Sequence, residues 1–269
     1  MKRGTLGLLF GLTFLAAAGS SPVRAEIAVD LELVLAIDVS GSIDSTEAFL
    51  QREGYIQALT SPEVVRAATA GPLGRIAVSY VEWAGSRHVR TVVDWQLIDG
   101  PEAAQRVADM VFDADLFPGQ RTAISNAILY ALPLFRDNGF AGTRRVIDIS
   151  GDGPNNDGLP VLAARKAAAA AGVSVNGLAI LNDRVGPYGY PTLQDLDVYY
   201  EECVIVGQGA FVLVADGFSD FSRAIRRKLV LEIAGLTPRR AGLQSVSGYD
   251  CLIGERQLRQ WLERAPFDP

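Results

Sequence analysis

From Leu31 to Ile233, segments whose apolar residues are spaced as in a strand alternate with segments whose apolar residues are spaced as in a helix. Residues 31–37 are apolar almost throughout, which is typical of a strand that is covered on both faces. Further strands are predicted at residues 144–149, 173–180 and 210–214. Helical spacing of apolar residues predicts helices at residues 45–59, 159–171, 193–201 and 218–231, and two more that begin at residues 101 and 123. Pro62 lies just beyond the first of these helices.

Two strand patterns are too close together for a parallel connection. Residues 75–83 and 88–95 are separated only by residues 84–87. So short a link requires an antiparallel hairpin. The order of elements therefore predicts an α/β fold. We expect a doubly wound, mostly parallel central sheet with one antiparallel edge hairpin and helices on both faces.

The beginning of the chain resembles an export signal. Lys2 and Arg3 precede an apolar run at residues 6–18, and Val23-Arg24-Ala25 follows as a small-x-small cleavage pattern. We expect residues 1–25 to be a signal peptide and the protein to be periplasmic or secreted in a bacterium. Residues 26–233 would form the main domain. Residues 234–269 would form an appendage with a helix at 255–264.

The charge balance narrows the class of partner. The formal net charge is −6, and removing the leader makes it more negative. Such a chain is a poor candidate for binding nucleic acid or an anionic membrane. The short basic runs Arg226-Arg227-Lys228 and Arg239-Arg240 are interpreted as the end of a helix and its solvated exit. No transmembrane segment is expected in the mature chain, since the apolar run at residues 6–18 is too short to span a bilayer comfortably and none of comparable length follows.

Cys203 and Cys251 are the two cysteines of the chain. In an exported protein an even pair favours a disulfide, although two buried free thiols would also fit. A bridge would tie the appendage to the segment before the last predicted strand.

Oxygen-bearing side chains gather where predicted strands end. Asp38, Ser40 and Ser42 follow the first strand, Asp152 follows residues 144–149, and Thr122 opens a helix that can reach the same edge. Carboxyl ends of strands are where open α/β sheets bind ligands. Carboxylates and hydroxyls are ligands for a hard cation such as Mg²⁺ or Mn²⁺. Alternatively, the serines cap the next helix, a role that Asp44 or Ser45 could equally fill.

These residues carry a family resemblance. Asp38-Val39-Ser40-Gly41-Ser42, Thr122 and Asp152-Gly153 resemble the metal-ion-dependent adhesion site of von Willebrand factor A (VWA) domains. Within that superfamily the chain looks most like exported, uncharacterised bacterial proteins whose site strand reads much like residues 146–156 (VIDISGDGPNN). The resemblance implies direct metal contact by Ser40, Ser42 and, in some states, Thr122, with Asp38 and Asp152 often acting through water. It also implies that a Glu or Asp of a partner protein completes the metal shell.

Several further residues border this predicted site. Arg121 stands where the family usually has Gly or a small residue, and its guanidinium could repel the ion or clamp a carboxylate. Asp148 could orient the metal ligands, or lie at the surface or cap an element. Arg184, Tyr188 and Tyr190 occupy a Pro/Gly-rich loop that either contacts a partner or is purely structural. Residues 155–157 are expected to serve turns and caps.

The rival class is a metal-dependent phosphoryl-transfer or hydrolytic enzyme. Haloacid dehalogenase-like phosphatases need an acid where this chain has Ser40. The sole histidine, His88, is predicted to lie in the hairpin, far from the site, which makes a Ser-His-Asp triad improbable. We therefore expect an exported, divalent-cation-dependent protein-binding domain and no enzyme. A VWA scaffold without metal function is the third alternative.

Overall fold

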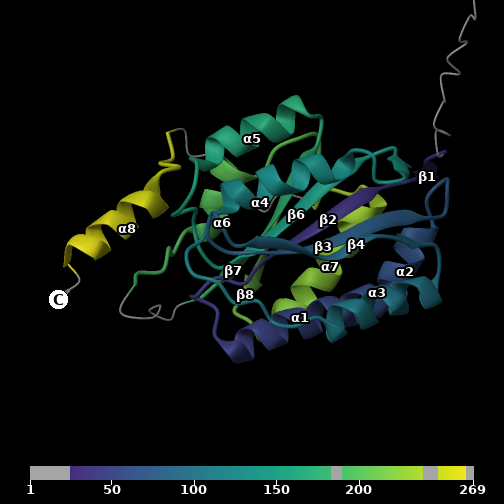
Figure 1. Cartoon of the computed structure of the whole chain (residues 1–269), viewed down its shortest axis with the longest axis horizontal. Coiled ribbons are helices and arrows are strands. Elements are labelled where there is room, and N and C mark those ends of the chain that lie inside the picture. The colour runs from purple at the N-terminus through teal and green to yellow at the C-terminus, as the bar shows by residue number, and fades with distance from the viewer. Residues whose placement is uncertain (1–24, 183–189, 239–247, 265–269) are drawn as a thin grey trace, which may run out of the picture.

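The computed structural model describes residues 25–182, 190–238 and 248–264 of the 269-residue chain. A six-stranded sheet with the order β4-β3-β2-β6-β7-β8 runs through its centre (Figure 1). β3 and β4 are antiparallel, and the other neighbouring strands of this sheet are parallel, as the sequence predicts. The strands are β2 (Glu32–Asp38), β3 (Ile76–Trp83), β4 (Val89–Ile98), β6 (Arg145–Gly151), β7 (Ser174–Leu181) and β8 (Val212–Asp216).

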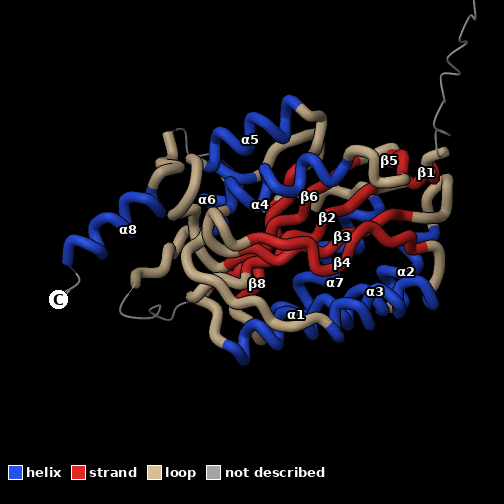
Figure 2. Tube along the Cα trace, viewed as in Figure 1, coloured by secondary structure: helices blue, strands red, loops and turns tan. Residues whose placement is uncertain are grey.

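Helices cover both faces of this sheet (Figure 2). One face packs against α1 (Ser45–Thr60), α2 (Pro62–Thr69), α3 (Pro101–Asp113) and α7 (Phe221–Ala234). The other face packs against α4 (Ile124–Ala131), α5 (Val161–Ala170), α6 (Leu196–Tyr199) and the short turns Leu132–Phe135 and Tyr200–Val204. Each face has its own apolar core, which explains why β2 is buried along its whole length.

Two features differ from the sequence-based expectation. Pro62 lies just beyond α1, as expected, but it also begins a second helix, α2, that was not predicted. Proline suits the first helical position, and Ser61 Oγ caps α2 by accepting the Val64 N–H at 3.4 Å. A separate two-stranded parallel sheet joins β1 (Ile27–Val29) to β5 (Phe140–Gly142). Strands of three residues are too short to show a periodic pattern.

The direction of winding reverses between β2 and β6. The chain passes from β2 to β3 on one side and from β6 to β7 on the other. β2 and β6 are hydrogen-bonded neighbours, with Ile37 opposite Ser150. Their carboxyl ends therefore form the switch point at which such sheets bind ligands.

Lys228 lies within α7 and is buried, which corrects the interpretation of its basic run as the end of a helix. Its side chain is 0% exposed and forms ion pairs with Asp148 of β6 and, at 2.8 Å, with Glu232 of α7. Asn176 Nδ2 also donates to Glu232 Oε1 at 2.8 Å. Burial, reinforced by the Glu232 charge, raises the pKa of the Asp148 carboxyl, and Lys228 opposes that rise. Asp148 is therefore neither a surface nor a capping residue, and its ion pair ties β6 to α7.

Removing the ammonium group should leave two buried carboxylates without a counter-charge. We expect Lys228→Met to lower the free energy of unfolding by about 3–5 kcal/mol at pH 7, measured by urea denaturation. Lys166→Met is the matched control, since Lys166 is exposed on α5, and should change stability by less than about 0.5 kcal/mol. Equal stability of the two variants would contradict the structural role of Lys228.

Candidate metal centre

The turn after β2 is shaped by the Asp38 carboxylate. Asp38 Oδ1 accepts the Ser40 N–H at 2.7 Å, and the Ile43 N–H donates to the Ser40 carbonyl at 3.0 Å. α1 is then capped by Asp44, whose Oδ1 accepts the Glu47 N–H at 2.9 Å while Glu47 Oε2 accepts the Asp44 N–H at 3.0 Å. Ser40 and Ser42 are therefore not the helix cap, and that alternative is wrong.

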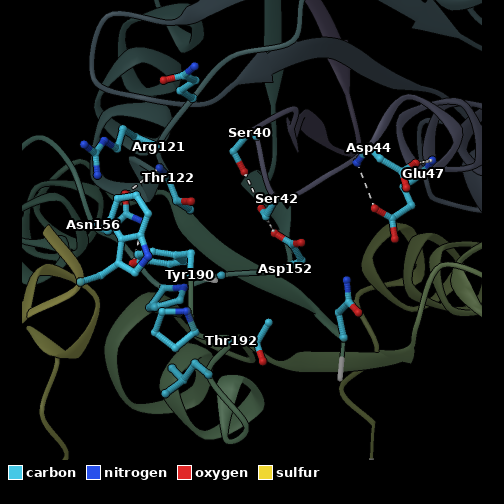
Figure 3. Close-up of a pocket in the computed structure, with 18 of the residues that line it drawn as sticks. Ser40, Ser42, Asp44, Glu47, Arg121, Thr122, Asp152, Asn156, Tyr190 and Thr192 are labelled. Carbon is cyan, nitrogen blue, oxygen red and sulfur yellow. Dashed lines mark hydrogen bonds between the residues drawn. The ribbon is translucent and has the colours of Figure 1, made fainter. Parts of the chain in front are cut away.

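The two serine hydroxyls converge with the carboxylate of Asp152 (Figure 3). Ser40 Oγ lies 3.1 Å from Ser42 Oγ, and Ser42 Oγ donates to Asp152 Oδ1 at 2.7 Å. The close approach of the end of β6 to Asp38 depends on Gly151, because a Cβ at this position would lie 2.8 Å from Asp38 Oδ2. The structure thus brings residues from the ends of β2 and β6 into one group.

Thr122 reaches the same pocket from the loop before α4. Its N–H donates to Asn156 Oδ1 at 2.8 Å, and its carbonyl accepts the Asn156 N–H at 2.8 Å. Thr122 and Asp152 both line the pocket and are 5% and 7% exposed. Asn156 was expected to serve a turn or cap; it instead holds the Thr122 backbone beside the loop after β6.

His88 lies in the hairpin connection, directly before β4, and is not part of the pocket lining. Its ring stacks on Phe117 with centroids 3.7 Å apart, and Nε2 lies 2.7 Å from the Phe117 carbonyl oxygen. The guanidinium carbon of Arg90 also lies over the Phe117 ring, 4.5 Å from its centroid. His88 and Arg90 therefore hold the loop that leads to Gln120 and Arg121 at the rim of the pocket.

Arg121 has a left-handed backbone, with φ of 67°. Glycine adopts this conformation without steric cost, which gives a physical reason for the family's preference for glycine at this position. The Arg121 side chain extends away from Ser40 and Ser42 and toward the side of Asn156 (Figure 3). Tyr190 lies on that side, and its hydroxyl accepts from Asn156 Nδ2 at 3.2 Å. Arg184 and Tyr188 lie outside the described residues.

The two carboxylates of the site are difficult to ionise together without a cation. Asp38 is fully buried, and burial together with the nearby Asp152 raises its pKa well above its ordinary value. Burial raises the pKa of Asp152 to about 6, against the opposing hydrogen bond from Ser42. Asp38 Oδ2 has no hydrogen-bond partner among the described residues. A divalent cation would supply the missing partner and counter-charge.

The donor set fits a hard cation. Within the described ranges, no group of three or more His, Cys, Asp or Glu side chains could hold a metal. The candidate centre relies instead on three hydroxyls and two carboxylates, all of which are oxygen donors that suit Mg²⁺ or Mn²⁺. Asp148 is not part of it, because its ion pair goes to Lys228.

Four of the five predicted ligands, Ser40, Ser42, Thr122 and Asp152, line a pocket of about 570 Å³. Asp38 is not part of the lining, but its carboxylate accepts the N–H of Ser40. The sequence did not point to the opposite wall, which includes Trp261 and Leu262 of α8 (Ile253–Arg264). The Cys203–Cys251 disulfide, with its Cα atoms 5.5 Å apart, confirms the predicted bridge and brings this appendage to the domain. In the sequence, the pair of cysteines was the feature that indicated that this segment lies against the domain.

Comparison with known proteins identifies the family. Residues 28–237 match the model of a family described as "Protein of unknown function (DUF1194)". The chain belongs to the DUF1194 family. No curated protein matches this DUF1194 chain.

Solved structures show that this DUF1194 protein has a VWA fold. Proximal thread matrix protein 1 from the mussel byssus, with a zinc-occupied MIDAS motif, superposes with a TM-score of 0.52 at 18% identity over 78% of this chain and 49% of its own. The pilus adhesin SpaC from Lactobacillus rhamnosus GG gives 0.56 at 13% identity over 78% and 31%. The chain therefore spans about half or less of the length of these proteins.

Within the described parts of the DUF1194 chain, every helix is too short or too polar to cross a bilayer.

The raised pKa of Asp152 predicts a pH-dependent stability of the metal-free protein. An unfolded Asp has a pKa of about 3.9, whereas the folded value is about 6. The folded state therefore holds this proton more tightly, and its contribution to stability is complete below about pH 4 and is lost as pH rises through about 6. In the presence of a chelator, the free energy of unfolding measured by chemical denaturation should fall as pH rises through this range. The fall should be roughly 2–3 kcal/mol larger for wild type than for Asp152→Asn.

Asp157→Asn serves as the control on the same loop. The pKa of Asp157 is lowered, through hydrogen bonds from Ser86 that outweigh its burial. This variant should keep the wild-type decline between pH 4 and 6. If the stability of wild type and of Asp152→Asn changes in parallel with pH, the pKa of Asp152 is not raised in the metal-free protein.

Proposed function

We propose that this protein is an exported VWA domain that binds Mg²⁺ or Mn²⁺ and, through that ion, a carboxylate of a partner protein. Asp38, Ser40, Ser42, Thr122 and Asp152 would hold the ion. The observation that carries the proposal is the contact chain from Ser40 Oγ through Ser42 Oγ to Asp152 Oδ1, beside an Asp38 oxygen without a hydrogen-bond partner.

The chemistry of the donors favours capture of an external acid. Hydroxyls are neutral, so two carboxylates at most face a divalent ion from this protein. An ion held in this way retains affinity for another anionic oxygen. The pocket that these hydroxyls line supplies space for such a group. An Asp or Glu side chain from a partner matches both requirements.

A binding role is better supported than catalysis. The one histidine is engaged with Phe117 at the rim and is absent from the pocket lining. A Ser-His-Asp arrangement would require its ring beside Ser40 or Ser42. The zinc-occupied MIDAS motif of the mussel protein and the adhesin description of SpaC agree with a metal-dependent binding domain.

Export is supported by the disulfide. A buried bridge between Cys203 and Cys251 is stable in an oxidising compartment and uncommon in the cytosol. The basic start and apolar run of residues 1–25 are consistent with the same route. We therefore infer a periplasmic or secreted location.

Metal binding can be measured directly. Calorimetric titration of the purified chain with Mg²⁺ and Mn²⁺ should give one site per chain, and Ser40→Ala combined with Ser42→Ala should weaken it at least about tenfold because two direct ligands are lost. Ser222→Ala is the control, since Ser222 lies on α7 outside the pocket lining. Equal metal affinity in the double variant and wild type would refute the proposed ligand set.

A further inference from the structure

The appendage forms a wall of the candidate metal pocket. α8 projects beyond the helical layers, at the end of the molecule where β2 and β6 finish (Figure 1). Trp261 and Leu262 of this helix line the pocket together with Tyr190 and Pro191. The rings of Tyr190 and Trp261 meet edge to face, with centroids 5.8 Å apart. We call these four residues the apolar wall.

α8 is firmly attached beside the metal loops. The Cys203–Cys251 bridge fixes its beginning. Asn155 Nδ2 donates to Glu255 Oε1 at 2.9 Å. A Cβ at Gly254 would lie only 2.1 Å from the Asn155 carbonyl oxygen, so glycine is required for this approach. The wall is therefore held in place by covalent and polar contacts, and it is not a loosely attached tail.

The apolar wall is also connected to the metal ligands. Asn156 binds the backbone of Thr122 through its Oδ1 and the hydroxyl of Tyr190 through its Nδ2. Tyr190 in turn contacts Trp261. One buried asparagine thus fixes the distance between the candidate ion and the aromatic surface. The family match ends at residue 237, so α8 is supplied by the part of this chain beyond it.

Across the pocket, the chemistry of the lining changes. Asp44 and Glu47, at the start of α1, lie on one side of the pocket and Tyr190 on the other, with Ser42 and Asp152 between them (Figure 3). A ligand that carries one carboxylate to the ion would gain by placing an uncharged, bulky group against the apolar wall. A second acidic group on the α1 side would be repelled by Asp44 and Glu47. A volume of about 570 Å³ encloses a few residues of an extended segment, in the range of ligand pockets.

We propose that the pocket recognises a peptide segment of a partner in which one Asp or Glu stands directly beside a bulky apolar residue. The carboxylate binds the ion, and the apolar side chain packs on Trp261, Tyr190, Pro191 and Leu262. This specificity rests on the proposed metal-dependent function, and α8 determines it.

Blocked tetrapeptides test this specificity. The probes are acetyl-Gly-Glu-Phe-Gly-amide and acetyl-Gly-Phe-Glu-Gly-amide, each paired with the same sequence carrying Ala in place of Phe. They are titrated calorimetrically into the full chain in saturating Mn²⁺. At least one Phe peptide should bind about tenfold more tightly than its Ala counterpart, because a phenyl ring is buried. Trp261→Ala should reduce that ratio to about twofold or less and leave the affinity for Mn²⁺ alone unchanged.

Gln260→Ala is the matched control, because Gln260 is the exposed neighbour of Trp261 on α8 and does not line the pocket. It should keep the wild-type preference. Mn²⁺ binding without peptide binding, or with equal affinity for Phe and Ala peptides, would overturn the inference and leave the metal site standing. A preference that survives in Trp261→Ala would also overturn it. Absence of Mn²⁺ binding in wild type would remove the proposed function and this specificity together.

Discussion

The structure is organised around two buried carboxylates, Asp38 and Asp152, at the ends of adjacent parallel strands. Burial raises the pKa of both groups, and what lies between them is a set of neutral hydroxyls from Ser40 and Ser42. Such a pair destabilises a metal-free protein unless a proton or a cation neutralises it. Gly151 permits this proximity, since a larger residue would collide with Asp38. The cost of this arrangement is readily explained if the site is built for a divalent ion.

Contacts from distant parts of the chain fix the geometry of that site. Asn156 sets the position of Thr122, and His88 and Arg90 hold the preceding loop through Phe117. The disulfide and Gly254 bring α8 across the same edge. On the opposite face, Lys228 joins α7 to Asp148, two residues before Ser150 on the site strand. The pocket therefore depends on both helical layers and on the appendage.

The sequence predicts what local pattern determines. A continuous apolar run revealed β2, and the four-residue link revealed the hairpin of β3 and β4. The ligand residues could be placed at one edge because carboxyl ends of parallel strands coincide. Contacts between residues that are far apart in the sequence cannot be predicted from such local patterns. Lys228 lies in a basic run that was interpreted as a helix end, and its buried ion pair is with Asp148, eighty positions earlier. Trp261 showed no pattern that would direct it to the pocket; only the cysteine pair hinted at this placement.

The most direct test of the central claim is anomalous X-ray diffraction from crystals of this protein soaked in Mn²⁺. The account predicts an anomalous peak within coordination distance of Ser40 Oγ and Ser42 Oγ, about 2.0–2.3 Å away, with Asp38 and Asp152 around it directly or through water. A Mn²⁺ peak elsewhere, with these hydroxyls still hydrogen-bonded to one another and to Asp152, would contradict the account.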